Sequence, residues 1–447
     1  MKFIPNSNLK NEMLKEIELN SIEDLFSDIP SKIKIKELDL SEGLSQQETE
    51  KKLRQIADKN KPIADNHNFL GGGIKPHYIP SAVKSIISRS EFYTAYTPYQ
   101  SEASQGFLQA MFEYQSIIAK ITGMDVANCS VYDGVTALSE AALMCMRITS
   151  KKKFIIPKSI SWEKKCVLKN YGKGPGIKVE EINYDSKTGK ISLKELEKKI
   201  DENTAGVYIE NPNFFGVFED DAEKISKTVK DAGALFVVGI DPISLGIIKS
   251  PGEYGADIVI GEGRALGNPM DYGGSSLGIF ACKKEYVRQM PGRIIGLTTD
   301  NKGKQAFCMA LQTREQHIRR GKATSNICTN EGFNALTACV YLSWLGGNGL
   351  QELSKQNFEN GQKLASEITK IKGFEKNFSG VHFNELVIKC PDGPDIINKE
   401  LLQKGIHGGL SLKDQYPELK DCMLIGITEI HTDEDIKQLV SCLEEAL

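Results

Sequence analysis

The segment from Glu91 to Gln105, EFYTAYTPYQSEASQ, contains the densest group of side chains that could do chemistry. Its tyrosines recur at every third position, and amide, carboxylate and hydroxyl groups follow them. Tyrosines at this spacing could equally form the core-facing stripe of a helix, but the proline at position 98 and the many Thr, Ser and Gln residues argue against a regular helix. We therefore expect an irregular polar segment that lines a binding site. The residues concerned are Tyr93, Tyr96, Tyr99, Gln100, Glu102, Ser104 and Gln105.

A second candidate site lies in SVYDGVTALSEAAL, at residues 130–143. Gly134, Val135 and Thr136 open a helical pattern, and the first turn of a helix has backbone N–H groups without partners in the helix. These groups, together with the Thr136 hydroxyl, would suit an anion such as a phosphate. Asp-Gly before a helix is also a common turn and cap, so the motif alone leaves both interpretations open.

Three further segments are placed where α/β folds put functional groups. Asp241 directly follows an apolar strand, at the edge of the sheet where ligands bind. Residues 261–281 contain six glycines and begin at the end of the next apolar strand. The segment IRRGKATSN, residues 318–326, combines basic and hydroxyl side chains in a predicted loop, which could also be a solvated linker. Its candidate site residues are Thr324, Ser325 and Asn326.

Composition and missing motifs exclude several classes of protein. The 56 basic and 59 acidic residues give a net charge of −3, which argues against a general binder of nucleic acid or anionic membranes. The six histidines are scattered, and the ten cysteines include no CxxC pair, so we expect no metal site, no histidine-based triad and reduced thiols. With no leader-like N-terminus and no apolar run long enough for a membrane span, a cytoplasmic location is expected.

The elements that position these groups alternate between strands and helices. Short apolar runs predict strands at 154–157, 177–182, 206–210, 235–240, 257–261 and 277–281, with amphipathic helices between several of them. This alternation predicts an α/β fold with a mostly parallel central sheet. The 447 residues suit two or three domains. We expect an N-terminal helical extension with a Gly-rich loop (1–75), a large domain (76–330) and a small C-terminal α/β domain (331–447).

The order of these signals resembles the fold-type I pyridoxal-phosphate transferases, which have an aspartate-aminotransferase-like fold. In that resemblance, Gly134–Thr136 match the phosphate loop and Asp241 matches the aspartate that faces the pyridine nitrogen. The Schiff-base lysine should follow the strand at 257–261, but no lysine occurs between Lys249 and Lys283. The position reads Gly261, Glu262, Gly263, Arg264, and a guanidinium stays protonated, so it cannot replace the amine.

Long motifs also resemble one family. YTAYTPYQSEASQGFLQAMFEYQ, ANCSVYDGVTA, GEGRALGNPMDYGGSSLGIFA and TREQHIRRGKATSNIC are similar to subunit 1, the alpha chain, of glycine dehydrogenase (decarboxylating), the P-protein of the glycine cleavage system. The resemblance implies an α2β2 assembly in which the beta subunit binds pyridoxal phosphate on its own lysine and this chain binds none covalently. It also implies that the complex decarboxylates glycine and passes the aminomethyl group to the lipoyl arm of H-protein.

Two other interpretations stay open at this point. The chain could be an independent pyridoxal-phosphate enzyme of the cysteine-desulfurase or aminotransferase type, which would need a lysine from elsewhere in the sequence. It could also be a scaffold that stabilises its partner without taking part in catalysis. In that case, the polar segment at 93–105 would serve assembly, and removing its side chains would not change the rate.

Overall fold

The computed structural model describes residues 7–35, 37–62, 67–95, 98–274 and 276–446. The chain forms two compact units, Met1–Lys61 and Pro62–Leu447. In the first unit, helix α2 begins after Ser45, and a capping box between Ser45 and Glu48 closes its first turn. The elements of this unit are η1 (Ser7–Leu9), α1 (Lys10–Glu16), η2 (Glu23–Phe26) and α2 (Gln46–Ala57).

The second unit is built on a seven-stranded sheet with the order β2-β8-β7-β6-β5-β3-β4. The five strands from β7 to β4 run parallel, and β8 is antiparallel to both of its neighbours. The predicted mostly parallel sheet is therefore confirmed. Its strands are β2 (Val126–Ala127), β3 (Lys153–Pro157), β4 (Lys178–Ile182), β5 (Thr204–Asn211), β6 (Leu235–Ile240), β7 (Ile258–Glu262) and β8 (Gly278–Cys282).

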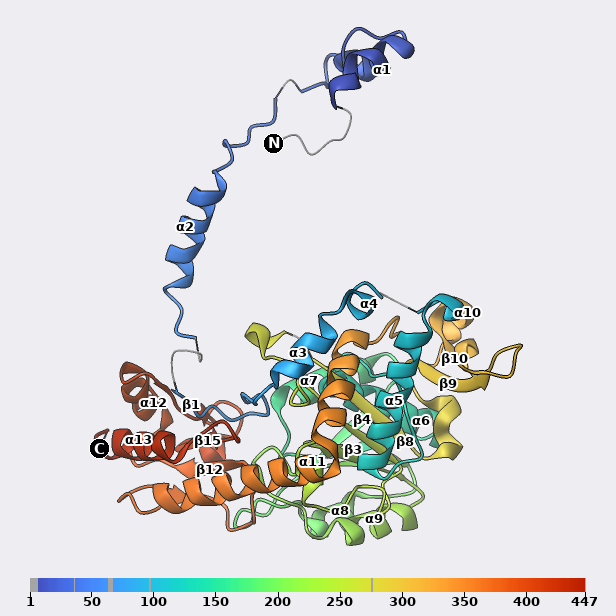
Figure 1. Ribbon diagram of the computed structural model, residues 1–447. Helices are drawn as coiled ribbons and strands as arrows, with labels where there is room; N and C mark the ends of the chain where they lie inside the picture. The colour runs from blue at the N-terminus through green and yellow to red at the C-terminus, as the bar shows by residue number, and fades with distance from the viewer. Residues whose placement is uncertain (1–6, 36, 63–66, 96–97, 275, 447) are drawn as a thin grey trace. The chain divides into compact units, whose positions relative to one another are not determined.

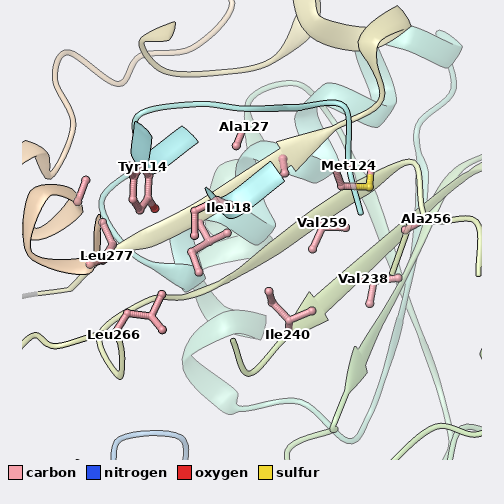
Figure 2. Close-up of a cluster of buried hydrophobic side chains, with 14 of the residues drawn as sticks. Tyr114, Ile118, Met124, Ala127, Val238, Ile240, Ala256, Val259, Leu266 and Leu277 are labelled. Carbon is pink, nitrogen blue, oxygen red and sulfur yellow. The ribbon is translucent and has the colours of Figure 1, made fainter. Parts of the chain in front are cut away.

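Both faces of this sheet are buried, because successive side chains of a strand point to opposite faces and both sides carry helices. In β6, Phe236 and Val238 pack in one core cluster, whereas Leu235 and Val237 pack in the other. Figure 2 shows part of the first cluster, to which Ile118 of α5 and Val259 of β7 both belong. One face is covered by α5 (Gln105–Thr122), α8 (Leu193–Lys199), α9 (Ala222–Asp231) and the first part of α11 (Gly332–Ile368), and the other by α6 (Gly134–Thr149) and α7 (Trp162–Lys173).

A smaller antiparallel sheet forms near the C-terminus, with the order β11-β12-β15-β14. It packs against α12, α13 and the second part of α11 (Figure 1). Helix α11 consists of two helical segments that meet at a kink at Gly346, whose φ is +64° and whose ψ is −177°. The remaining elements are β11 (Glu375–Lys376), β12 (Glu385–Lys389), β14 (Leu410–Ser411), β15 (Cys422–Gly426), α12 (Pro394–Gln403) and α13 (Asp433–Glu444).

The Gly-rich loop belongs to this second unit rather than to the N-terminal extension. A Cβ on Gly71 would lie 2.8 Å from the backbone carbonyl oxygen of Leu424 in β15, so only glycine fits this close approach. The loop follows the short strand β1 (His67–Asn68), which pairs in parallel with β13 (Ile406–His407). The compact unit thus starts at Pro62, before the boundary predicted at 75. The boundary predicted at 330 stays a prediction.

The remaining parts of the second unit lie at the edge of the large sheet. A hairpin of β9 (Ile294–Thr299) and β10 (Gln305–Ala310) packs beside α5. The short helices are α3 (Ser81–Ile87), α4 (Ser90–Tyr93) and α10 (Gln316–Arg319). Among the described residues, no helix is long and apolar enough to cross a membrane, and no group of three or more His, Cys, Asp or Glu side chains could hold a metal ion.

Candidate active site

The first turn of α6 is closed by two carboxylates of this chain. Asp133 is the N-cap, and its Oδ1 accepts a hydrogen bond from the N–H of Thr136 at 2.5 Å. The N–H of Gly134 donates to Oε2 of Glu262 at 3.0 Å. Val135 lies between them and is half-buried. The predicted helix start is confirmed, but a carboxylate already binds the Gly134 N–H that a phosphate would contact.

Glu262 ends β7, where the Schiff-base lysine was expected. Its Oε1 accepts hydrogen bonds from the N–H groups of Arg264 at 3.0 Å and Leu277 at 2.9 Å. Burial raises the pKa of Glu262 above its ordinary value, and these hydrogen bonds oppose the rise only in part. The flanking glycines are close-packed, since a Cβ on Gly261 or Gly263 would come within 3.0 Å of a neighbouring side chain. The end of β7 therefore leaves little room for a larger group.

Arg264 has a structural role in this position. Its side chain is buried, and its guanidinium donates to Ser276 Oγ at 2.7 Å and to the carbonyl oxygens of Gly273 at 3.4 Å and Met270 at 3.5 Å. These contacts hold the turn between β7 and β8. A guanidinium cannot lose its proton at neutral pH, so Arg264 does not replace the lysine chemically.

Asp241 follows the carboxyl end of β6, as predicted, and faces a lysine that the sequence did not single out. Lys75 Nζ lies 3.9 Å from Asp241 Oδ2 and 3.1 Å from Glu385 Oε2, with a side chain that is 3% exposed. Glu385 Oε1 also accepts hydrogen bonds from the N–H groups of Gly72 and Gly73. Burial works to lower the pKa of Lys75, but Glu385 and Asp241 outweigh it and raise the pKa. Lys75 is therefore an ammonium ion in a salt bridge, not a free amine that could form a Schiff base.

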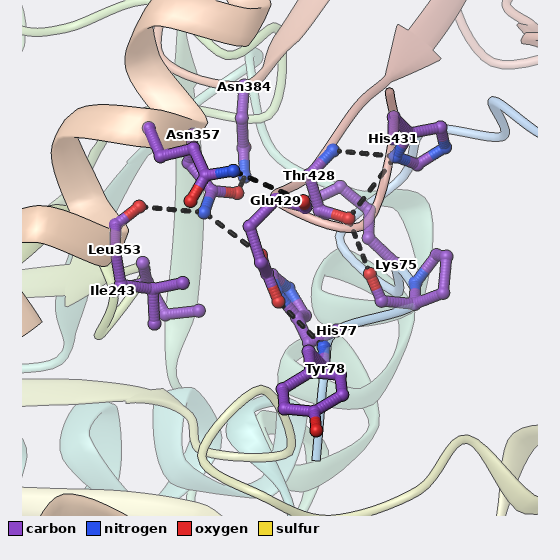
Figure 3. A network of polar contacts seen from close by, with 12 residues as sticks. Lys75, His77, Tyr78, Ile243, Leu353, Asn357, Asn384, Thr428, Glu429 and His431 are labelled. Carbon is purple, nitrogen blue, oxygen red and sulfur yellow. Dashed lines mark hydrogen bonds and ion pairs between the residues drawn. The ribbon is translucent and has the colours of Figure 1, made fainter. Parts of the chain in front are cut away.

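A second polar network continues from this lysine along the same loop (Figure 3). His77 Nδ1 lies 3.0 Å from Glu429 Oε2, and the N–H of Tyr78 donates to Glu429 Oε1 at 2.7 Å. Asn357 of α11 donates to Glu429 at 3.0 Å and accepts a hydrogen bond from Asn384. Burial opposes ionisation of Glu429, but His77 and these donors lower its pKa to about 2. The network fixes the loop that carries Lys75 against α11 and the C-terminal sheet.

A cavity of about 280 Å³ opens beside Tyr99. Arg293 is buried at its wall, with its guanidinium 5.2 Å from the centroid of the Tyr99 ring and within 3.2 Å of the Tyr99 hydroxyl. Gln312, His317 and the exposed Cys328 also line the cavity. The guanidinium, the phenol and the imidazole of this cavity suit a small carboxylate, and the carboxylate of Glu315 in the same lining opposes one.

Tyr93, the other described tyrosine of the segment, does not line this cavity. Tyr93 ends α4, is 71% exposed and makes an edge-to-face contact with Phe333 at 5.8 Å. Tyr96 lies outside the described residues. Of the two described tyrosines, Tyr99 therefore lines this cavity, whereas the ring of Tyr93 is exposed to solvent.

Some of the polar residues that follow Tyr99 are exposed, whereas others are hydrogen-bonded within the fold. Gln100 and Glu102 are exposed, and Ser104 is half-buried before the first turn of α5. Gln105 accepts a hydrogen bond from the N–H of Phe307 at 2.9 Å and donates to its carbonyl oxygen at 2.8 Å. The amide of Gln105 therefore ties α5 to β10, so Gln105 positions the segment and is less available to a ligand.

The predicted loop at 324–326 is anchored on the same chain. Thr324 donates its N–H to the carbonyl oxygen of Arg314 at 3.1 Å, and Ser325 Oγ donates to Glu140 Oε1 at 2.8 Å. Asn326 is exposed. Burial raises the pKa of Glu140, which lies in the middle of α6. The loop thus lies on the helix whose first turn resembles a phosphate loop.

Comparisons with known proteins assign the family. The family model for the glycine cleavage system P-protein matches residues 1–443. The chain belongs to this P-protein family. It is 49% identical over 445 residues to a probable glycine dehydrogenase (decarboxylating) subunit 1 of Thermococcus onnurineus (strain NA1), and the alignment covers 99% of each chain. It is 48% identical over 447 residues to the protein of the same name in Thermococcus kodakarensis (strain ATCC BAA-918 / JCM 12380 / KOD1), which covers 100% of this chain and 98% of that protein.

Solved structures place the fold as well. A crystal structure of glycine decarboxylase (P-protein) of the glycine cleavage system, in inhibitor-bound form, has a TM-score of 0.91, 39% identity and full coverage of both chains. A sphingosine-1-phosphate lyase from Burkholderia pseudomallei K96243 has a TM-score of 0.65 at 13% identity, covers 93% of each chain and thus shares the fold alone. The predicted fold-type I transferase architecture of this P-protein family member is confirmed.

The sequence did not indicate the roles of Lys75, Glu385 and Arg293. Lys75 and Glu385 are 310 positions apart in the sequence, and Arg293 lies far from Tyr99, so no local pattern connects them. The only signal was the run of three glycines before Lys75, which indicated a loop with a function. Lys75 follows this loop, so the glycines were the signal for a lysine that pairs with Asp241.

Proposed function

We propose that this chain is the alpha subunit of a glycine dehydrogenase (decarboxylating) that acts only together with a second, lysine-bearing beta subunit. The observation that carries the proposal is the end of β7, where Glu262 and Arg264 replace the Schiff-base lysine in a chain of the P-protein family. Full-length similarity to proteins named subunit 1 supports a heteromeric assembly. We assign it the composition α2β2, and place it in the cytoplasm because all ten cysteines are free thiols.

The residues of this chain do not fit a covalently bound pyridoxal phosphate. Glu262 accepts the hydrogen bond from Gly134 that a phosphate would take, and Lys75 forms the ion pair with Asp241. Introducing the phosphate here would bring it against a carboxylate in a buried space, which costs free energy. The cofactor of the complex is therefore assigned to the lysine of the beta subunit, and no step is assigned to a cofactor on this chain.

This chain contributes to catalysis through the cavity that Tyr99 and Arg293 line, which we call the open cavity. Arg293 and Tyr99 can bind the carboxylate of glycine and orient it, since a charge-assisted hydrogen bond from a buried guanidinium is strong. Tyr93, Tyr96, Gln100, Glu102 and Ser104 would line the mouth through which the lipoyl arm of H-protein enters. Thr324, Ser325 and Asn326 would face the phosphate of the partner's cofactor, with positive potential from Arg319, Arg320 and Lys322.

The test measures glycine-dependent exchange of CO2 by this chain, by the beta subunit and by the complex. We expect exchange by the complex only, and visible absorbance of a Schiff base only when the beta subunit is present. Exchange by this chain alone, or a Schiff base formed on it by added pyridoxal phosphate, would contradict the proposal and favour an independent enzyme. If Tyr99→Ala weakened assembly without changing the rate of the assembled enzyme, the chain would be a scaffold.

A further inference from the structure

A hollow of about 620 Å³ lies along helix α11, and we call it the α11 hollow. The described residues that line it come from both sides of the kink at Gly346, from the loop that follows Lys75 and from the loop before α13. Small-molecule sites occupy roughly 300–1,000 Å³, so the hollow is large enough for such a ligand. It shares no described lining residue with the open cavity beside Tyr99.

Three aromatic side chains line the α11 hollow. Tyr341 and Trp344 lie on α11 before the kink, and Tyr78 lies on the loop that follows Lys75. Tyr341 is buried, whereas Trp344 and Tyr78 are exposed. The face of an aromatic ring carries negative potential and attracts a cation, and a tryptophan ring does so most strongly. The rings therefore favour a positively charged ligand.

The charged side chains of the lining have the same preference. Glu352 and Glu429 are carboxylates, and none of the described lining residues is Lys, Arg or His. Glu429 is held in place by Asn357 and by the N–H of Tyr78 (Figure 3), and His77 pairs with it. Glu352 is exposed and forms no ion pair with any described residue. The hollow thus has a fixed carboxylate and a second carboxylate without a counter-charge from the described chain.

This combination suits an organic cation better than a metal ion. Calcium and magnesium ions take six or more oxygen ligands, and two carboxylates beside three rings cannot supply such a shell. Among the described residues, no group of three or more His, Cys, Asp or Glu side chains could hold a metal ion. An alkylated ammonium ion, in contrast, packs its methyl and methylene groups against aromatic rings while its charge faces a carboxylate.

We propose that the α11 hollow is a binding site for a small organic ammonium ion. The ion lies against Trp344 and Tyr78, and its charge faces Glu352 and Glu429. The bound ion would contact both segments of α11 and the loop that follows Lys75, so it would hold these elements together. The occupant is a free small molecule, and its binding does not depend on the proposed function.

The experiment uses choline as the probe and the fluorescence of Trp344 as the readout. The chain has two tryptophans, so Trp162→Phe leaves Trp344 alone in the full-length chain. Choline is expected to change the fluorescence of this variant saturably, with half-saturation at roughly 1–10 mM. The uncharged alcohol 3,3-dimethylbutan-1-ol has the same shape as choline and should cause no saturable change.

Two further variants, made in the Trp162→Phe chain, locate the binding. Glu352→Gln removes the unpaired carboxylate and should weaken the binding of choline about 2- to 5-fold. Tyr78→Ala removes a ring and should weaken it about 3- to 10-fold. The matched control is Glu367→Gln, which neutralises a carboxylate of α11 outside the hollow and should bind choline as the parent does.

Three results would count against the inference. If the uncharged alcohol changed the fluorescence as choline does, the hollow would be an apolar groove without preference for a cation. If choline caused no saturable change below about 100 mM, the hollow would not be a site for such an ion. If the chain alone bound choline but its complex with a second subunit did not, the partner would cover the hollow, and a small-molecule site there would be overturned.

Discussion

Two regions of the second unit differ in how open they are to a neighbouring chain. In the closed cluster, formed by Lys75, Asp241, Glu262 and Glu385, each charged group faces a partner from its own chain. In the open cavity beside Tyr99, Arg293 is buried against a tyrosine ring that is itself 60% exposed. The closed cluster includes the ends of β6 and β7, a position that resembles the cofactor site of fold-type I enzymes.

This difference shows how a fold-type I architecture can pair its buried charges with other groups of the same chain. A buried charge without a partner destabilises the fold, so a chain that gives up the cofactor must supply other charges in its place. Glu262 supplies the anion at the start of α6, and Lys75 supplies the cation beside Asp241. The cavity beside Tyr99, by contrast, is bordered by exposed side chains, among them Tyr99 and Cys328.

The largest expected effect comes from breaking the closed cluster at its cation. Lys75→Met leaves the buried Glu385 and the half-buried Asp241 without their counter-charge, and we expect the free energy of unfolding to fall by about 3–5 kcal/mol. Urea denaturation of the isolated chain measures it. The second variant, Lys75→Met with Glu385→Gln, should recover part of the loss, since a glutamine still accepts from Gly72 and Gly73. A single variant as stable as the parent would show that the cluster does not stabilise the fold.

The next effect depends on pH and concerns Glu429, which fixes the loop that carries Lys75. The folded-state pKa of about 2 lies below the ordinary 4.5, so the ionised group stabilises the fold above about pH 4.5, and this contribution is lost as the pH falls toward 2. Glu429→Gln should therefore cost about 2–3 kcal/mol at neutral pH. The difference from the parent should shrink as the pH falls below about 4.5. The exposed Glu434→Gln is the control and should show no such dependence.

The open cavity should respond in activity rather than in stability. Tyr99→Ala removes the ring over Arg293, and we expect kcat/KM for glycine in the assembled complex to fall about 10- to 100-fold. The melting temperature should hardly change, because the side chain is mostly exposed. Tyr99→Phe keeps the ring and loses only the hydroxyl, so it should lie between the parent and the alanine variant. An alanine variant with full activity would remove the cavity from the catalytic site.

The smallest effect is expected at the loop that lies on α6. Ser325→Ala removes the hydrogen bond to Glu140 and the one from the N–H of Ile327, and should cost about 1 kcal/mol of stability. Differential scanning calorimetry of the isolated chain measures this. Binding of the beta subunit is the second measurement, because a loop that also faces the partner should lose affinity. A loss of stability alone would indicate that Ser325 only anchors the loop.

Much of the fold could be predicted because its signals are local. The apolar runs ending near Ile240 and Gly261 predicted strands at the right places, and the start of α6 at Gly134 followed from its turn residues. The sequence also placed the Gly-rich loop correctly as irregular, but not the sheet on which it packs.

The sequence by itself determined the family, the α/β pattern and the absence of a lysine between Lys249 and Lys283, because each of these is contained in the order of the residues. Only the tertiary structure decided that Glu262 binds the start of α6, that Lys75 neutralises Asp241, and that Arg293 lies beneath Tyr99. These pairs join residues that are far apart in the chain. Electrostatic interactions act over a few ångströms in space, and only the folded chain brings such charges that close.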